Sequence, residues 1–255
     1  MDVLDEVRKS YILNIMKNKK RADERPFDAY RSINVEKGVI KTAEGSAQVR
    51  IGDTQVLVGI KVDVGEPFPD RPDEGVITTN AELLPLASPG FEPGPPDENC
   101  IELARIVDRG IRSSNAIDLK TLLIEENKVW VIFFDIYVLD HDGNLIDASA
   151  LAAMAALLNL KLPKYEDGKV IREESTPLKV NTKAVSCTFA KIGNEIVLDP
   201  SLDEEIAMDG RLTIATTPNS ICAAQKAGKA GFTKEEILSC MDIAFRKGDE
   251  LRALI

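Results

Sequence analysis

The chain has 255 residues, 44% of them hydrophobic, which is enough to bury a substantial core as one large domain or two intimate subdomains. Lys and Arg total 32 against 42 Asp and Glu, so the net charge of -10 would repel a polyanion unless the basic residues gather locally. No apolar run approaches the roughly 20 residues of a membrane span, and the N-terminus is amphipathic and charged rather than signal-like. We therefore expect a soluble, cytoplasmic protein with no membrane contact.

Several classes of metal and cofactor protein are poorly supported by the sequence. Cys100, Cys187, Cys222 and Cys240 are widely scattered, with no CxxC pair, so a zinc ribbon does not fit. His141 is the only histidine, which argues against most hydrolase triads and zinc enzymes. No GxxxxGK[ST] or strand-bound GxGxxG motif occurs. We expect no cofactor and no bound metal.

The first elements are a helix and a hairpin. Residues 3–19 place Leu4, Val7, Tyr11 and Ile15 at spacings of three and four, which predicts a helix with these four side chains on its apolar stripe. Residues 47–65 then alternate apolar and polar positions around Gly52, and β-branched residues dominate. This pattern predicts a long antiparallel hairpin.

Two further strands and two helices are expected in the middle of the chain. Residues 74–84 predict a strand stopped by Pro85, and a proline-rich and glycine-rich loop over 88–98 leads into a helix over 99–114 that Asp97 can cap. Residues 128–140 predict a buried strand. We expect Asp147 to cap an alanine-rich, buried helix over 148–160, whose end Pro163 marks.

The last part of the chain predicts a second hairpin over 184–200, a strand over 211–217 and a final helix. The hairpin turns at Gly193, and the helix begins with a capping box from Thr233 to Glu236. The predicted buried face of this helix comprises Ile237, Leu238, Met241, Ala244 and Phe245. Strand runs with separate helices indicate an α+β fold of mixed or antiparallel sheets layered with helices, in one domain with approximate halves 1–165 and 180–255.

The most informative basic feature is the helix over 99–114. Arg105, Arg109 and Arg112 recur at four and then three residues, while its apolar residues fall on the other side. Such a helix can dock by one face and present arginines, whose forked guanidinium groups suit phosphate, by the other. The alternative is an ordinary solvated face with local pairs to Glu102 and Asp108.

Two acidic features have competing interpretations. Asp140 and Asp142 flank His141, which invites an acid-base or metal site, but adjacent strand residues point to opposite faces and Asp-Gly favours a tight turn. We predict a turn there. The acidic run from Asp199 to Asp209 offers hard ligands for a divalent cation, although a solvated acidic loop is commoner.

Four segments, taken in order, resemble the RNase PH family over nearly the whole chain, and within it the non-catalytic branch of the archaeal exosome. They are residues 50–62, residues 102–114 (ELARIVDRGIRSS), residues 142–160 (DGNLIDASALAAMAALLNL) and residues 198–217, followed by the closing helix. Active members of this family shorten RNA from its 3′ end, with inorganic phosphate as the nucleophile. The resemblance over nearly the whole chain implies an RNase PH-like fold.

The resemblance also implies that catalytic parts are missing. Where the family has a Gly-Gly-Thr-Arg element that grips phosphate, this chain has Gly143, Asn144, Leu145 and Ile146. Where the family has its catalytic aspartate, immediately before the strand LTIAT, this chain has Arg211. Isoleucine cannot bind phosphate by charge or side-chain hydrogen bond, and arginine stays protonated. We expect no catalytic residues in this chain.

The resemblance further implies a heterohexameric ring of three heterodimers with a paralogous catalytic subunit, RNA-binding cap proteins and single-stranded RNA. Arg105, Arg109 and Arg112 would then bind RNA. The leading hypothesis is a non-catalytic, RNA-guiding subunit that shapes the site of its catalytic partner. Two alternatives remain: a metal-dependent nuclease that uses Asp199, Asp203 and Glu205, and an acidic assembly module without RNA contact.

Overall fold

The computed structural model describes residues 3–255, and the larger of its sheets contains six strands. Five of them follow the order β1-β2-β3-β6-β4, and β5 pairs with β6. All neighbours are antiparallel except β4 and β6, which run parallel. The strands are β1 (Ile33–Lys37), β2 (Gly45–Ile51), β3 (Thr54–Gly65), β4 (Val76–Leu83), β5 (Leu123–Glu125) and β6 (Lys128–Asp140). The predicted hairpin over 47–65 is confirmed as β2 and β3.

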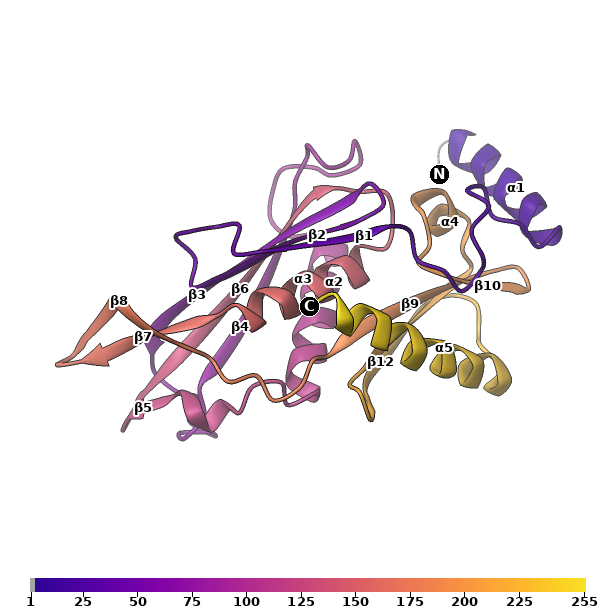
Figure 1. Cartoon of the computed structure of the whole chain (residues 1–255). Coiled ribbons are helices and arrows are strands. Elements are labelled where there is room, and N and C mark those ends of the chain that lie inside the picture. Colours follow the sequence, from indigo (N-terminus) through magenta and orange to yellow (C-terminus); the bar gives the residue numbers. More distant parts are fainter. Residues whose placement is uncertain (1–2) are drawn as a thin grey trace.

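The C-terminal half forms a separate antiparallel sheet of four strands in the order β10-β9-β11-β12. Its strands are β9 (Val185–Ile192), β10 (Glu195–Leu198), β11 (Gly210–Thr216) and β12 (Ile221–Gly228). A two-stranded hairpin of β7 (Lys161–Glu166) and β8 (Lys169–Pro177) projects from the other end of the molecule (Figure 1). The predicted second hairpin is confirmed as β9 and β10.

Helix α3 (Leu145–Leu158) lies between the two sheets and packs against β2 and β3 on one side and β9 on the other (Figure 1). Its alanines permit a close approach to the larger sheet. A Cβ atom built on Gly45 would lie 2.6 Å from the carbonyl oxygen of Ala156, so only glycine fits at this contact. The buried helix that the sequence predicted is confirmed, and its side chains join both sheets in one hydrophobic core.

The start of α3 differs from the prediction. Asn144, in a left-handed conformation with φ of 55°, precedes the helix, and Asp147 lies inside its first turn. Asp147 is fully buried and accepts hydrogen bonds from Tyr30, Asn144 and Thr188. The prediction that Asp147 caps the helix was therefore wrong, because tertiary partners use its carboxylate. Pro163 also lies within β7, beyond the end of the helix.

The remaining helices are α1 (Val3–Lys17), α2 (Glu98–Ser113), the short 3-10 helix η1 (Leu119–Leu122), α4 (Leu202–Ala207) and α5 (Lys234–Ala253). The predicted apolar stripe of α1 was wrong at three of its four residues: Leu4, Val7 and Tyr11 are exposed. Ile15 is partly buried and packs with Ile12 and Met16, which form the buried face. Helix α1 packs against α4, and this contact decides which face of α1 is buried.

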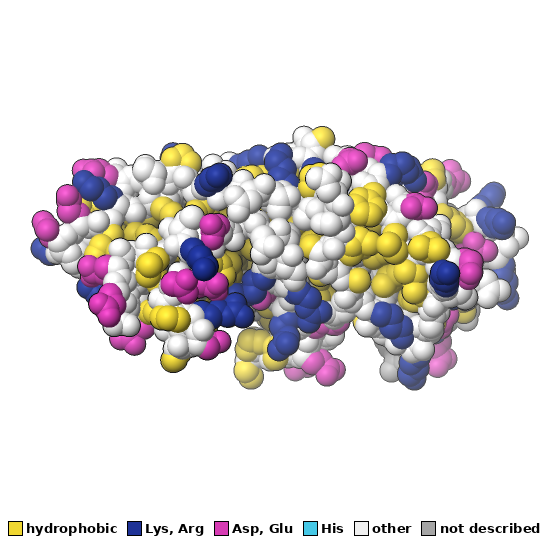
Figure 2. Space-filling model, turned by 90° about the horizontal axis from the view of Figure 1, so that it is seen from below, with side chains coloured by type: hydrophobic (Ala, Val, Ile, Leu, Met, Phe, Trp, Pro, Cys, Tyr) yellow, Lys and Arg dark blue, Asp and Glu magenta, His cyan; other side chains and the backbone are white. Residues whose placement is uncertain are grey.

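Part of the predicted buried face of α5 is exposed. Ile237 and Leu238 are on the surface, whereas Cys240, Ala244 and Leu251 are buried against β9 and β11. Figure 2 shows apolar side chains gathered on the face seen from below, towards the C-terminal half of the molecule. The capping box at Thr233 and Glu236 is confirmed.

Candidate functional site

Helix α2 presents its arginines as the sequence predicted. The carboxylate of Asp97 caps the helix by accepting a hydrogen bond of 2.8 Å from the backbone N–H of Cys100. The opposite face is buried against β4 and α3 through Leu103, Ile106, Val107 and Ile111. Arg105, Arg109 and Arg112 are exposed. Because hydrophobic docking fixes the helix axis, these side chains project from a rigid element.

The three arginines border one open depression of about 430 Å³, whose floor includes Thr79 of β4. They differ in how firmly they are held. Arg112 donates to the Asp108 carboxylate at 2.7 Å and to the carbonyl oxygen of Ile77, and Arg109 donates to the Gln225 side chain at 2.9 Å. Within residues 3–255, Arg105 has neither a side-chain hydrogen bond nor an ion pair. Arg105 and Arg109 therefore keep most of their donors free.

The chain's negative net charge does not prevent local gathering of cations. Figure 2 shows Lys and Arg side chains clustered near the middle of the face seen from below, interspersed with acidic side chains. The depression beside α2 is lined by three arginines and one acidic residue, Asp108. Such a surface can bind a polyanion although the whole molecule carries a net charge of -10.

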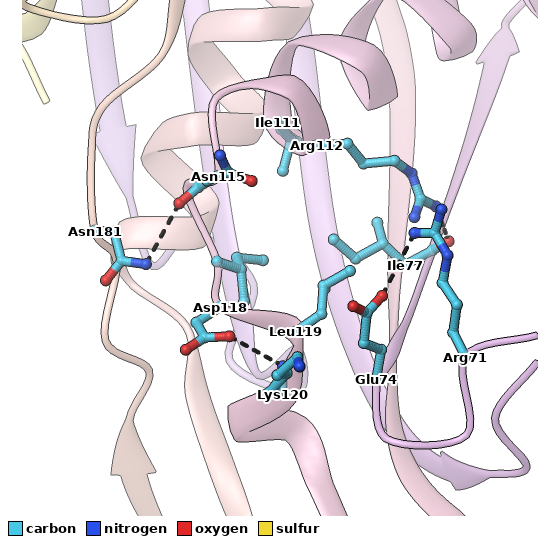
Figure 3. Close-up of a pocket in the computed structure, with 11 residues that line it drawn as sticks. Arg71, Glu74, Ile77, Ile111, Arg112, Asn115, Asp118, Leu119, Lys120 and Asn181 are labelled. Atoms are coloured by element: carbon cyan, nitrogen blue, oxygen red, sulfur yellow. Dashed lines mark hydrogen bonds and ion pairs between the residues drawn. The ribbon is translucent and has the colours of Figure 1, made fainter.

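A neighbouring hollow of about 410 Å³ lies at the C-terminal end of α2. Figure 3 shows Arg112 and Arg71 on one rim and Asn181 on the other. Its basic residues are already paired, since Arg71 lies 3.4 Å from Glu74 and Lys120 lies 3.2 Å from Asp73. This hollow is locally balanced in charge, so it is a weaker candidate for phosphate than the depression on the exposed face of α2.

The third relevant cavity, of about 480 Å³, brings together the two positions at which the sequence departs from the family pattern. Ile146 from the first turn of α3 and Arg211 from β11 both line it. Glu205 from α4, His141 from the end of β6 and Glu102 from α2 line it as well. We call it the Arg211 pocket. Its other lining side chains are Leu83, Phe91, Asn99, Leu103, Ile106, Leu145, Leu202, Ile206 and Met208.

Arg211 is neutralised inside this pocket. Its guanidinium group lies 3.1 Å from the Glu102 carboxylate, and only 17% of its side chain is exposed. Glu102 therefore pairs across elements with Arg211 rather than along its own helix, which sequence reasoning did not predict. An arginine so held supplies neither a free anion site nor an acid for proton transfer.

The segment before α3 has an unusual backbone conformation. Gly143 and Asn144 have φ of 88° and 55°, a region that glycine adopts freely and asparagine tolerates. A Cβ atom on Gly143 would lie 2.5 Å from the carbonyl oxygen of Pro200. Two successive residues of positive φ therefore form the tight turn that leads into α3.

Glu205 has the one strongly perturbed carboxyl group among the described residues of the Arg211 pocket. Burial raises its pKa to about 7, although the backbone N–H of Asn144 donates to it at 2.9 Å and opposes the shift. The other carboxylate that lines the pocket, Glu102, is paired with Arg211, so neither of these two side chains is free to act with Glu205.

The acidic run does not form the metal site considered from the sequence. Asp199 is buried and accepts hydrogen bonds from Arg25, Arg31 and Asn144, whereas Asp203 lies in a surface pair with Arg8. No group of three or more His, Cys, Asp or Glu side chains that could hold a metal occurs within residues 3–255. A nuclease mechanism through Asp199, Asp203 and Glu205 is not favoured.

The predicted turn after β6 is present, and His141 has a packing role in it. Its ring stacks on Phe91 with centroids 5.3 Å apart, and burial lowers its pKa. Asp142 pairs with Arg31 at 3.1 Å, away from the imidazole. The two carboxylates that flank His141 in sequence therefore do not assemble an acid-base site around it.

Comparison with protein families matches residues 29–163 to domain 1 of the 3′ exoribonuclease family, RNase PH, and residues 184–247 to domain 2. The chain belongs to the RNase PH family. The two matched segments correspond to the six-stranded sheet with α3 and to the four-stranded sheet with most of α5.

Individual RNase PH relatives cover the whole length. The exosome complex component Rrp42 of Thermococcus kodakarensis is 57% identical over 99% of this chain and 95% of the relative, and that of Pyrococcus furiosus is 54% identical over 100% and 94%. A solved structure of the Archaeoglobus fulgidus exosome with RNA bound to the active site aligns with a TM-score of 0.94, at 48% identity over 99% of both chains. Rice Rrp46, with 18% identity, a TM-score of 0.69 and coverage of 91% and 97%, shares the fold.

None of the helices in the described part of this RNase PH chain is long and apolar enough to cross a membrane.

Proposed function

We propose that this chain is a non-catalytic, RNA-guiding subunit of a 3′-to-5′ phosphorolytic exoribonuclease ring. The single observation that carries the proposal is the convergence of Ile146 and Arg211 on one pocket. Each stands where an active family member has a catalytic part, and Arg211 is already neutralised by Glu102. A site without a phosphate clamp and without its acid cannot hold the nucleophile or transfer a proton.

The role left to the chain is to bind RNA along α2. Arg105, Arg109 and Arg112 are the proposed RNA-binding residues, because they are exposed on a rigid helix and border one depression. Arginine pairs with phosphate through two parallel hydrogen bonds, and such contacts need no particular base. The chain would guide single-stranded RNA towards an active centre that another subunit completes.

The proposed assembly is a heterohexamer of three heterodimers, in which this chain alternates with a paralogous catalytic subunit below RNA-binding cap proteins in the cytoplasm. The names of the Rrp42 relatives and of the exosome structures support this assignment. We also propose that the halves 1–165 and 180–255 act as one domain, since a single hydrophobic core includes side chains of both. A hinge between them would expose α3.

The decisive experiment is reconstitution with the partner subunit that carries an intact Gly-Gly-Thr-Arg element. We expect co-purification in equal stoichiometry, and phosphate-dependent release of nucleoside diphosphates by the complex but not by this chain alone. Replacing the partner's motif arginine should abolish release, whereas Ile146→Ala in this chain should leave it intact. Release of nucleoside diphosphates by this chain alone would refute the proposal.

The competing role, an assembly module without RNA contact, makes a different prediction. Ultraviolet crosslinking of RNA to the reconstituted complex should label this chain on peptides from α2 if it guides RNA. Labelling confined to the partner, with the complex intact, would favour the assembly module and would assign the arginines to protein contacts.

A further inference from the structure

The degenerate catalytic position is connected to the RNA-binding face of α2 by a continuous set of polar contacts. Arg211 pairs with the Glu102 carboxylate at 3.1 Å, through Oε2. The other carboxylate oxygen, Oε1, accepts a hydrogen bond of 2.7 Å from the Gln225 side-chain amide. Gln225 in turn accepts a hydrogen bond of 2.9 Å from Arg109. We call these four residues, Arg211, Glu102, Gln225 and Arg109, the relay.

The order of donors and acceptors in the relay is fixed by chemistry. A carboxylate can only accept, so Gln225 has to turn its NH₂ group towards Glu102. Its carbonyl oxygen then faces Arg109, which is only a donor. Without a charged Glu102 held in place, the Gln225 amide could reverse and present its NH₂ group to the guanidinium, where no hydrogen bond is possible. Glu102 thus sets the orientation that holds Arg109.

Arg211 is the group that holds Glu102 in place. Its side chain is largely enclosed between β11 and α2, and the Glu102 side chain is 33% exposed. Without this cation, the Glu102 carboxylate would keep only its hydrogen bond to Gln225 among the described residues. An acid at position 211, as in active family members, would repel Glu102 and have the same effect.

We propose that Arg211 is a positioning residue for RNA binding, acting on Arg109 through Glu102 and Gln225. The inference rests on the proposed function of the α2 arginines and deepens it. One nitrogen of Arg109, Nη1, is anchored by Gln225, which limits the conformations of the side chain. The remaining donors of the guanidinium group stay available for a phosphate oxygen pair, and a preordered fork loses less entropy on binding.

The test is a double-mutant cycle on RNA affinity, measured with a fluorescent single-stranded oligoribonucleotide and the full chain reconstituted with its partner. Arg211→Met, which removes the cation but keeps much of the volume, should weaken binding roughly three- to tenfold. Arg211→Lys retains an ion pair with Glu102 and should restore most of the affinity. Arg246→Met is the charge-matched control. It removes an exposed arginine of α5 that is paired with Asp28, and it should change RNA affinity less than twofold.

The combination with Arg109→Ala separates positioning from a structural or direct electrostatic effect. If Arg211 acts through Arg109, then Arg211→Met should have no further effect once Arg109 is alanine. An equal loss in both backgrounds would overturn the inference. Gln225→Leu breaks the relay at a residue of the edge strand β12 that does not line the Arg211 pocket. It should reproduce the loss of RNA affinity, and it serves as the test if Arg211→Met fails to fold.

The outcomes also separate this inference from the proposed function. If Arg109→Ala itself leaves RNA affinity unchanged, Arg109 is no RNA contact and the relay fails; the guiding role of α2 fails only if replacing Arg105 and Arg109 together also leaves affinity unchanged. If Arg109→Ala weakens binding while Arg211→Met and Gln225→Leu do not, only the relay is refuted. Loss of affinity in all three single variants, without additivity in the double variant, supports both.

Discussion

Arg31 donates two parallel hydrogen bonds to the carboxylate of Asp199, from Nε at 3.0 Å and from Nη2 at 2.9 Å. The same carboxylate accepts from Arg25 at 2.8 Å and from the side chain of Asn144 at 2.7 Å. Asp199 therefore ties the segment before β1 and the turn before α3 to the end of β10. A buried structural carboxylate therefore fixes the backbone of the turn that precedes α3.

Replacing Asp199 by asparagine should lower the free energy of unfolding by about 3 to 5 kcal/mol, because it leaves two guanidinium groups without their buried counter-charge. Chemical denaturation monitored by circular dichroism measures this change. Asp203→Asn removes a surface pair with Arg8 on the same segment and should cost less than about 1 kcal/mol. Equal effects of the two substitutions would contradict this account.

The same carboxylate predicts acid sensitivity. Burial by itself raises the pKa of Asp199, but the hydrogen bonds and charge of Arg31 outweigh it and hold the pKa below the ordinary value of 3.8. A lowered pKa in the folded state stabilises the fold above the unfolded pKa, and this contribution is lost as the pH falls. The stability difference between wild type and Asp199→Asn should therefore shrink below about pH 4, as urea denaturation at several pH values would reveal.

Glu205 should produce the opposite pH dependence. Burial raises its pKa from 4.5 to about 7, so its full contribution to stability is present below pH 4.5 and is lost as the pH rises through 7. Relative to Glu205→Gln, the wild type should lose roughly 1 to 3 kcal/mol of stability between pH 4 and pH 8. Glu235→Gln, at an exposed position of α5, should follow the wild-type profile. A constant difference between wild type and Glu205→Gln would argue against a shifted carboxyl group.

Replacing Arg105 and Arg109 together by alanine should weaken RNA binding and flatten its salt dependence. The magnitude of the slope of log affinity against log salt concentration should fall by about 1 to 2, because RNA binding releases fewer counterions when two phosphate contacts are lost. Fluorescence anisotropy titrations at several salt concentrations measure the slope. Arg112→Ala is less informative, because Arg112 also holds Asp108 and the backbone of β4.

The matched control for this pair is Lys164→Ala on the β7–β8 hairpin, where the lysine is paired with Glu166 and Glu174. It removes a cation far along the chain from α2 and should leave the slope unchanged. If the double arginine variant and the lysine variant gave the same slope, RNA binding would not depend on the α2 face.

Gly45→Ala should destabilise the fold by about 1 to 3 kcal/mol, because its Cβ atom would collide with the backbone of α3. Gly110→Ala is the contrasting substitution, since a Cβ atom there meets nothing within 4 Å and the residue lies inside α2. It should stabilise the protein by about 0.5 to 1 kcal/mol, through the helix propensity of alanine. Thermal unfolding of both variants checks the pair, and a neutral Gly45→Ala would contradict close packing of α3 on β2.

Elements with strong local signals were predicted correctly, and those that depend on docking were not. Alternation around Gly52 and Gly193 identified both hairpins, and Asp97 identified the start of α2. Strands β1, β5, β7, β8 and β12, the 3-10 helix η1 and helix α4 were missed, and most of these elements are short or largely polar. The buried faces of α1 and α5 were partly misassigned, because the spacing of apolar residues along a helix does not show which neighbouring element packs against it.

The sequence by itself determined the family, the substitutions Ile146 and Arg211 and the arginine face of α2, because each rests on residue identity or on helical period. Only the tertiary structure decided that these substitutions share one pocket and that Arg211 binds Glu102. Positions 102, 146, 205 and 211 are far apart in the chain, and a hydrogen bond needs atoms within about 3 Å. That proximity comes from α2, α3 and β11 meeting around one core, which no local pattern encodes.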